Sequence, residues 1–236
     1  MAGLAGQHVV ITGGAGALGA TVVQAFIQEG AYCHVPVRGA HAASGSDATM
    51  NGGGVRYVAG VDLTNESAVT AFYAGLPNDL WASVHLAGGF AMGGITETSL
   101  GDLRSQIDVN VITTFLCCRE AVRRFRLRPR GGGGRIVNVA SRAALQPGGH
   151  RAAYSLSKAA VVSLTTSLAE ELKRENILVN AVAPGVIDTA MNRAAMPEVE
   201  AAGMVTPAMI AAVIVWLASP ANTIASGAVI PVCGNS

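Results

Sequence analysis

Residues 8–19 read HVVITGGAGALG. The mostly apolar run at residues 8–12 predicts a buried strand, and the apolar side chains of Leu18, Val22 and Phe26 predict a helix over residues 17–29. Glycines between a strand and a helix let the backbone approach a phosphate group closely. The amides of the helix N-terminus then point at that phosphate. We therefore expect this turn to hold the pyrophosphate of a dinucleotide.

The rest of the chain alternates between strand-like and helix-like segments. We expect six further strands, near residues 32–37, 55–59, 81–86, 135–140, 177–182 and 228–232. Helices are expected near residues 66–74, 99–125, 151–174 and 207–218, and residues 41–54 read as a loop. Apolar strands separated by helices predict an α/β fold, a doubly wound parallel sheet of about seven strands with helices on both faces. No linker divides residues 1–236, so we expect a single domain.

Composition limits the classes of protein and partner. The chain has 236 residues, of which 50% are hydrophobic and 13% charged, with a formal net charge of +1. Such a chain can bury a core, and its charge predicts no nucleic-acid or anionic membrane partner. Sparse charge favours a homo-oligomer. The four cysteines form no CxxC and the five histidines show no metal-ligand spacing, so we expect a reduced cytoplasmic protein without a metal.

A tyrosine and a lysine stand four residues apart in the predicted helix 151–174. Tyr154 and Lys158 therefore share one face of that helix. A nearby ammonium group favours the phenolate and lowers the pKa of a tyrosine. Such a pair can transfer the proton of a hydroxyl group while a hydride moves at the adjacent carbon.

Other polar residues are placed where they could join this pair. Ser141 directly follows the strand at residues 135–140, and Pro184-Gly185 follows the strand at residues 177–182. Both lie at the carboxyl edge of the sheet, where ligands of such folds bind. Asn110 lies within the predicted helix 99–125, a position that is mildly unfavourable for asparagine and therefore suggests a specific use.

Together these residues resemble the short-chain dehydrogenase/reductase family, whose members have the Rossmann fold. The resemblance extends over nearly the whole chain and includes the step of thirteen residues from Ser141 to Tyr154. It implies an enzyme in which Tyr154 is the general acid/base and Ser141 holds the substrate oxygen. It further implies that Lys158 lowers the pKa of Tyr154 and binds the nicotinamide ribose, and that Asn110 holds a water linked to Lys158.

The resemblance also assigns the residues that bind the cofactor. At the pyrophosphate and its turn these are Gly13, Gly16, Ala17, Leu18 and Gly19; at the adenine Asp62 and Leu63; at the adenosine ribose Ala87 and Gly88; and at the nicotinamide Tyr154, Lys158, Pro184, Gly185, Ile187 and Thr189. Arg38 follows the second strand, where a carboxylate would favour NAD(H). Because no carboxylate stands there, we expect NADP(H) to be favoured over NAD(H).

The chain departs from the family pattern at three places, one of which is Cys233, near the C-terminal acidic position of many members. Several functions stay open. Ala17 replaces the usual second glycine of the turn, and His85-Leu86 replaces two asparagines, which predicts a loss of hydrogen bonds within the sheet. We expect hydride transfer between NADP(H) and a small apolar carbonyl or alcohol substrate, under a short lid near residues 190–205. The alternatives are an enzyme like quinoid dihydropteridine reductase, a dinucleotide-binding regulator without turnover, and an epimerase. His150 could line the substrate pocket or have no role.

Overall fold

The computed structural model describes residues 3–39, 48–50, 53–128, 133–196 and 203–234. One sheet forms its centre, with the strand order β3-β4-β2-β1-β5-β6-β7-β8. The strands are β1 (His8–Thr12), β2 (Tyr32–Pro36), β3 (Ala48–Met50), β4 (Gly53–Val58), β5 (Leu80–His85), β6 (Gly134–Val139), β7 (Ile177–Pro184) and β8 (Val229–Val232). Seven of these strands run parallel, which confirms the predicted doubly wound sheet.

The eighth strand, β3, was not expected. It pairs antiparallel with β4 at the edge of the sheet, within the segment that the sequence suggested to be a loop. Antiparallel edge strands on a parallel sheet are common, because a short hairpin is enough to add one. The other residues of that predicted loop up to residue 47, and residues 51–52, lie outside the described residues.

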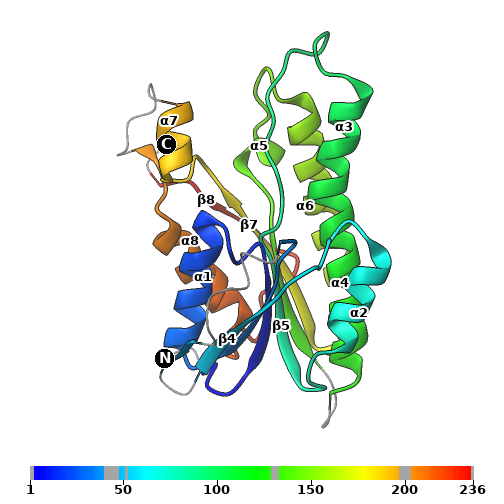
Figure 1. Cartoon of the computed structure of the whole chain (residues 1–236), viewed down its shortest axis with the longest axis vertical. Coiled ribbons are helices and arrows are strands. Elements are labelled where there is room, and N and C mark those ends of the chain that lie inside the picture. The colour runs from blue at the N-terminus through cyan, green and yellow to red at the C-terminus, as the bar shows by residue number, and fades with distance from the viewer. Residues whose placement is uncertain (1–2, 40–47, 51–52, 129–132, 197–202, 235–236) are drawn as a thin grey trace.

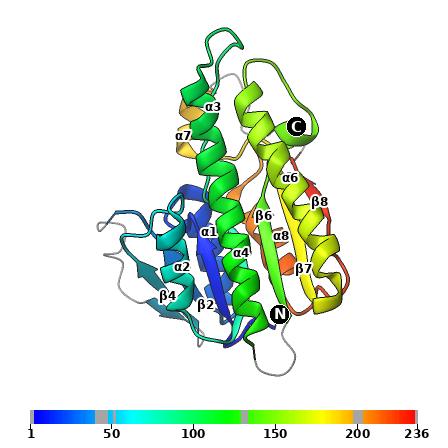
Figure 2. The same cartoon turned by 90° about the vertical axis from the view of Figure 1, so that its right-hand side faces the viewer.

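Helices cover both faces of the sheet (Figure 1). On one face α1 (Ala17–Gln28) packs beside α8 (Pro207–Ala218). The opposite face carries α2 (Glu66–Ala74), α4 (Thr113–Arg126) and α6 (Ala152–Leu172), which lie side by side in the view of Figure 2. The short helices α5 (Arg142–Leu145) and α7 (Ala190–Ala195) lie beyond the carboxyl ends of the strands.

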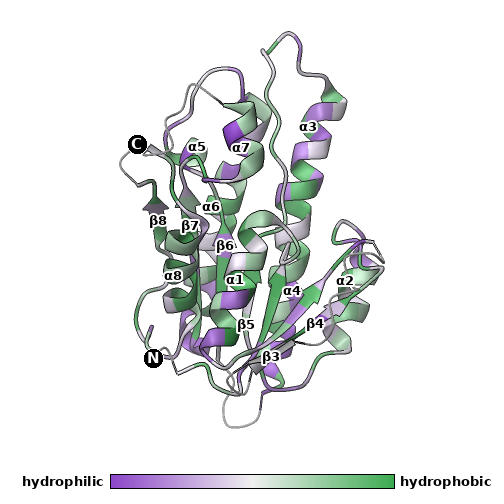
Figure 3. Ribbon diagram, turned by 60° about the vertical axis from the view of Figure 1, so that its left-hand side comes forward, coloured by the Kyte–Doolittle hydropathy of each residue, from purple (hydrophilic) through white to green (hydrophobic). Residues whose placement is uncertain are grey.

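Each face of the sheet has its own apolar core. Under α1 and α8 the core includes Phe26, Ile210 and Ile214, and under α2, α4 and α6 it includes Tyr73 and Phe125. Hydrophobic residues accordingly dominate the strands and the helix sides that face them in Figure 3. Because both faces are buried, the strands need the continuous apolar runs that the sequence shows.

The predicted helix at residues 99–125 is not a uniform α-helix. It begins as α3 (Leu100–Ile107), passes through a π-helical turn (Asp108–Ile112), and continues as α4. Ser99 caps its N-terminus and forms a capping box with Asp102. The π-turn contains Asn110, and such turns are frequent at functional sites.

The chain order reverses at the centre of the sheet. β1 is followed on one side by β2 and β4, whereas β5, β6 and β7 extend on the other side. In open α/β sheets ligands bind outside the carboxyl ends of the strands at this reversal, here between β1 and β5. Among the described residues, no helix is long and apolar enough to cross a membrane.

Candidate active site

The turn between β1 and α1 leaves helix amides open to an anion. Gly16 is the N-cap residue of α1 and supplies no side-chain cap, and the first turn of α1 contains no acidic residue. The first amides of a helix lack partners within the helix, so they can bind a phosphate group. Ala15, Gly16 and Ala17 are exposed, whereas Leu18 is partly buried. This geometry fits a dinucleotide pyrophosphate.

Two glycines of this turn allow close backbone approaches. Gly13 has φ +68°, and a Cβ there would lie 2.8 Å from the amide nitrogen of Ala87. A Cβ at Gly19 would collide with the carbonyl oxygen of Gly13. Ala87 is further fixed because its amide donates to Thr12 Oγ1 at 3.2 Å. The turn therefore packs directly on the segment after β5.

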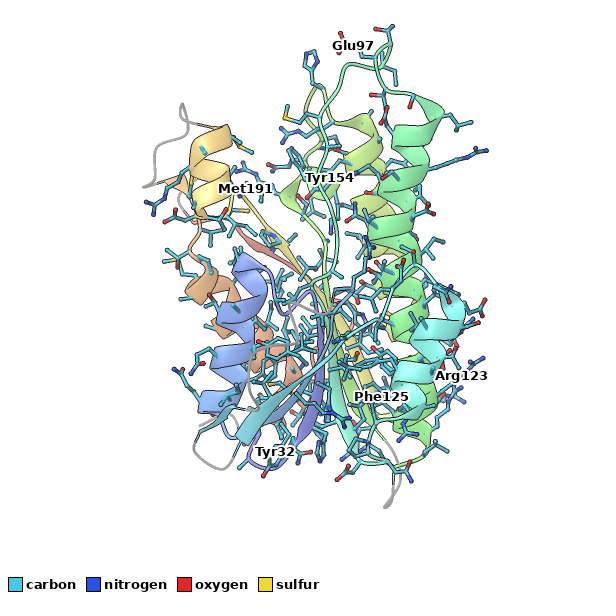
Figure 4. The ribbon with its side chains drawn as sticks, viewed as in Figure 1. Tyr32, Glu97, Arg123, Phe125, Tyr154 and Met191 are labelled. Carbon is cyan, nitrogen blue, oxygen red and sulfur yellow. The ribbon has the colours of Figure 1, made fainter. Side chains whose placement is uncertain are left out.

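Tyr154 lies near the start of α6, above the carboxyl ends of the strands (Figure 4). The ring of Phe90 meets its ring edge-on, with centroids 4.8 Å apart. Burial raises the pKa of the Tyr154 phenol, while a hydrogen bond with Ser141 and the charge of Arg151 act to lower it. The ammonium of Lys158 is not among the groups that shift this pKa in the described residues.

Lys158 is fully enclosed one turn further along α6. Its Nζ donates to the carbonyl oxygen of Val139, at the end of β6, over 2.8 Å. Burial lowers the pKa of Lys158 to about 8. An ammonium has three N–H donors, so the other two can bind the hydroxyls of a ribose. A Cβ at Gly88 would lie 3.3 Å from this nitrogen, so glycine there gives Lys158 its room.

Asn110 ties the π-turn to the segment after β5. Its Oδ1 accepts from the Gly89 amide at 3.0 Å, and its Nδ2 donates to the Gly89 carbonyl at 3.0 Å. Nδ2 also lies 3.1 Å from Ser157 Oγ, and Ser157 Oγ in turn donates to the carbonyl of Tyr154 at 2.7 Å. Asn110 thus connects three elements of the site, although its side chain is completely buried.

Ser141 stands between β6 and α5. Its Oγ accepts from the Ala143 amide at 3.2 Å and so caps α5. Through the hydrogen bond with Tyr154 noted above, the two hydroxyls lie side by side. A substrate oxygen that accepts from both hydroxyls would replace the hydrogen bond between them, because each hydroxyl carries only one donor.

The residues expected at the adenosine lie next to each other. Arg38 follows β2, is mostly exposed, and approaches the Oδ1 atom of Asp62 at 3.5 Å. Asp62 Oδ1 accepts from the amide of Thr64 at 2.9 Å and from its hydroxyl at 2.7 Å, and these bonds lower its pKa. Leu63, the next residue in the sequence, is buried. Asp62 is 24 positions away from Arg38 in the sequence, yet its carboxylate lies close to Arg38 in the folded structure.

The residues expected at the nicotinamide follow β7. Pro184 ends β7, and the Gly185 amide donates to the Val232 carbonyl at 3.0 Å. Ile187 forms a bridge with Val205, while its carbonyl accepts from the amides of Thr189 and the Asn192 side chain. Thr189 Oγ1 caps α7. The expected lid contains α7, and its residues 197–202 lie outside the described residues.

Three residues at the site carry no strong sequence signal. Phe90 and Ser157 contact Tyr154 as described, and Arg151 acts on it through its charge. Arg151 and Ser157 each stand three residues from Tyr154, and this spacing is the sequence signal that could identify them. His150 is exposed with φ +57°, and its carbonyl accepts from the Gly93 amide at 2.8 Å.

The expected loss of hydrogen bonds at His85 is wrong. His85 Nδ1 lies 2.8 Å from Asn138 Oδ1, and its Nε2 lies 2.8 Å from Ser83 Oγ. Because Asn138 Oδ1 can only accept, Nδ1 is the donor and Nε2 accepts from Ser83. The imidazole replaces the amide hydrogen bonds that an asparagine pair would make.

Fold and site define a nucleotide-binding α/β enzyme with a Tyr–Lys pair at the carboxyl edge of its sheet. The family model of the short chain dehydrogenases matches residues 7–200. The chain belongs to this short-chain dehydrogenase/reductase family and is an NAD(P)-dependent oxidoreductase.

Two sequence relatives represent this family. The chain is 34% identical to the oxidoreductase YgfF of Escherichia coli, covering 78% of this chain and 77% of that protein. It is 30% identical to the 3-oxoacyl-(acyl-carrier-protein) reductase MabA of Mycobacterium tuberculosis, covering 97% and 92%.

Solved structures show the same fold. A short-chain dehydrogenase/reductase from Mycobacterium ulcerans superposes with a TM-score of 0.89 at 28% identity, covering 98% of this chain and 90% of the other. L-sorbose reductase from Gluconobacter frateurii, in complex with NADPH and L-sorbose, gives a TM-score of 0.86 at 25% identity, covering 99% and 97%.

Proposed function

We propose that the chain reduces a carbonyl compound with NADPH, or oxidises the corresponding alcohol with NADP⁺. The observation that carries this proposal is that Ser141, Tyr154 and Lys158 lie at the same edge of the sheet as a glycine turn whose free helix amides suit a phosphate. When bound, NADPH supplies a hydride with its two electrons to the carbonyl carbon and becomes NADP⁺. The substrate oxygen then requires one proton.

Tyr154 is placed to give that proton. Its raised pKa keeps the phenol protonated at neutral pH, as a general acid requires. Ser141 would hold the substrate oxygen by a second hydrogen bond. Lys158 would bind the nicotinamide ribose, and its charge would stabilise the phenolate that proton donation leaves behind. Asn110 would keep the π-turn and the Gly89 segment in place beside Lys158, and it is the proposed holder of a water.

We propose NADP(H) as the preferred cofactor because Arg38 lies at the end of β2. A guanidinium can bind a 2′-phosphate through two hydrogen bonds. The structure of L-sorbose reductase, which contains NADPH, supports this choice for a chain of the same fold. The contact of Arg38 with Asp62 would have to yield to that phosphate.

We further propose that residues 1–236 form one domain with a lid around α7, and that copies of it assemble as a homotetramer or homodimer. Met191 of α7 is 79% exposed and lies across from Tyr154 in Figure 4. Its exposure suits an apolar substrate.

A panel of ketones and aldehydes, followed by NADPH absorbance, tests the reductase function. We expect consumption of NADPH with at least one apolar carbonyl compound. A regulator without turnover would consume no NADPH, and an epimerase would show no net consumption. Preferential reduction of a quinoid dihydropterin would favour the enzyme like dihydropteridine reductase.

A further inference from the structure

Arg151 occupies a fixed position three residues before Tyr154. It is the N-cap residue of α6, and its carbonyl accepts from the Ser155 amide at 2.8 Å. A backbone bridge joins it to Gly93 on the other side. The charge of its guanidinium reaches the Tyr154 hydroxyl, since it lowers the pKa of that group. Arg151 therefore belongs to the same edge of the site as Tyr154, because it caps the helix that carries this tyrosine.

The guanidinium rests against backbone and has no anionic partner. A Cβ at Gly148 would lie 2.9 Å from Arg151 Nε, so the guanidinium packs closely on the backbone at Gly148. Arg151 Nε is buried and makes no hydrogen bond in the described part of the chain. Within that same part, no carboxylate pairs with Arg151, whereas Arg119, Arg126 and Arg193 all form salt bridges.

Two exposed apolar side chains belong to the segment that borders Tyr154 and the Arg151 backbone. Phe90 is 50% exposed beside Tyr154, and Met92, next to the bridged Gly93, is 62% exposed. Monomeric proteins leave such side chains together mainly where they bind a ligand. A partly buried cation without a counter-ion is costly, and a ligand anion would remove that cost.

We propose that Arg151 binds a carboxylate of the substrate, so that the compound reduced at Tyr154 is an apolar keto acid. A carboxylate presents two oxygens in a plane, which matches the fork of one guanidinium. Its single negative charge also matches the single positive charge of the Arg151 guanidinium. This inference rests on the proposed carbonyl reductase function.

The test compares 2-, 3- and 4-oxohexanoate with their methyl esters, which differ only in the anionic group. Titration calorimetry in the presence of NADP⁺ measures binding, and NADPH absorbance measures turnover. We expect the wild type to bind at least one acid about 10- to 100-fold more tightly than its ester, the range for a charge-assisted hydrogen bond. Arg151→Gln should abolish this difference while changing ester affinity less than threefold.

Two further variants serve as controls. Arg151→Lys keeps the charge without the fork and should retain a reduced preference for the acid. Arg104→Gln, on an exposed arginine of α3, should bind both ligands as the wild type does. Equal affinity for acid and ester in the wild type would overturn the inference, as would an unchanged preference in Arg151→Gln. Selective binding of acids without NADPH oxidation would support it and would refute the reductase function instead.

Discussion

At the scale of single residues, Tyr154 illustrates how neighbouring groups shift the pKa of one hydroxyl. Burial raises its pKa, and Ser141 and Arg151 oppose that shift. The sequence suggested instead that Lys158 would be the group that lowers this pKa, but its Nζ is directed to the Val139 carbonyl. With its pKa raised above the ordinary value for a tyrosine, the phenol is protonated at neutral pH. Binding of a cofactor ribose to Lys158 would add the ammonium charge to the groups that shift the pKa of Tyr154.

Replacing Tyr154 by phenylalanine tests its role as the proton donor. Tyr154→Phe keeps the ring and its contact with Phe90 but removes the transferable proton. We expect turnover to fall by at least about 100-fold, the lower range for a general acid. Affinity for NADPH, measured by fluorescence titration, should stay within threefold. Near-normal turnover would remove Tyr154 from the mechanism.

The choice of dinucleotide depends on Arg38. Arg38→Ala should raise the KM for NADPH about 10-fold, the lower end for a charge-assisted contact, and should barely change the KM for NADH. Steady-state kinetics with both cofactors measures this difference. Asp62→Asn is the matched variant, because it removes the charge that approaches Arg38 and should strengthen the preference for NADPH. Equal effects of Arg38→Ala on both cofactors would show that Arg38 is a surface residue without a role in the choice of cofactor.

At the scale of elements, the π-turn at Asp108–Ile112 is the feature that positions Asn110. Asn110→Leu keeps the approximate volume but leaves the Gly89 amide and carbonyl without their partner. We expect the free energy of unfolding to fall by about 1–3 kcal/mol. Urea denaturation measures it, and Asn110→Asp should lose at least as much, because its second carboxyl oxygen would face the Gly89 carbonyl in a buried position. Unchanged stability of Asn110→Leu would mean that water replaces these bonds.

The sequence predicts elements better than it predicts their irregularities. Apolar periodicity and the glycine turn were enough for β1, α1 and the parallel sheet, because each signal is local. The π-turn was missed because DVNVI fits an ordinary helix equally well. β3 was missed because its pairing with β4 lies in a segment rich in small residues.

Side-chain partners far apart in sequence were also beyond prediction. The bonds of His85 with Asn138 and of Lys158 with Val139 join residues that meet only when neighbouring strands and a helix are assembled. By contrast, spacing and family resemblance in the sequence alone predict all four proposed catalytic residues. Their roles remain predictions, although three of them meet at one edge of the sheet.

At the scale of the whole molecule, a network of buried polar side chains links α2, the neighbouring strands β5 and β6, and α6. Tyr73 OH and Ser83 Oγ share a hydrogen bond of 2.8 Å, and the network continues from Ser83 through His85 to Asn138. Asn138 Nδ2 then donates to Thr165 Oγ1 at 2.9 Å. Every member is buried. A fully satisfied network of this kind stabilises one packing of strands and helices, whereas a broken one is costly.

The histidine in this network makes stability depend on pH. Burial lowers the pKa of His85 to about 4, from 6.5 in the unfolded chain. Between these values the unfolded state binds more protons, so stability rises with pH and is lost as the pH falls from 6.5 towards 4. The full effect is on the order of 3 kcal/mol. Urea denaturation at pH 7 and pH 5 should show a clear loss.

His34, whose pKa is also lowered to about 4 mainly by burial, adds to the same loss. His85→Asn separates the two contributions, since it removes one titrating group and keeps a side chain that can bond Asn138. The difference in unfolding free energy between pH 7 and pH 5 should be about half as large in this variant. An identical difference in both proteins would show that His85 does not titrate on unfolding.

The outer face of α4 and α6 leads to the last prediction, which concerns assembly. A groove of about 380 Å³ lies there, lined by Phe115, Leu164 and Leu168 among charged side chains. Phe115 is 46% exposed, and an apolar groove with a charged border is typical of an interface. Phe115→Glu should therefore reduce the mass of the proposed homo-oligomer in light scattering at micromolar concentration. Leu100→Glu, on a 61% exposed leucine of α3, is the matched control and should leave the mass unchanged. A wild-type protein that scatters as a monomer would contradict the proposed assembly.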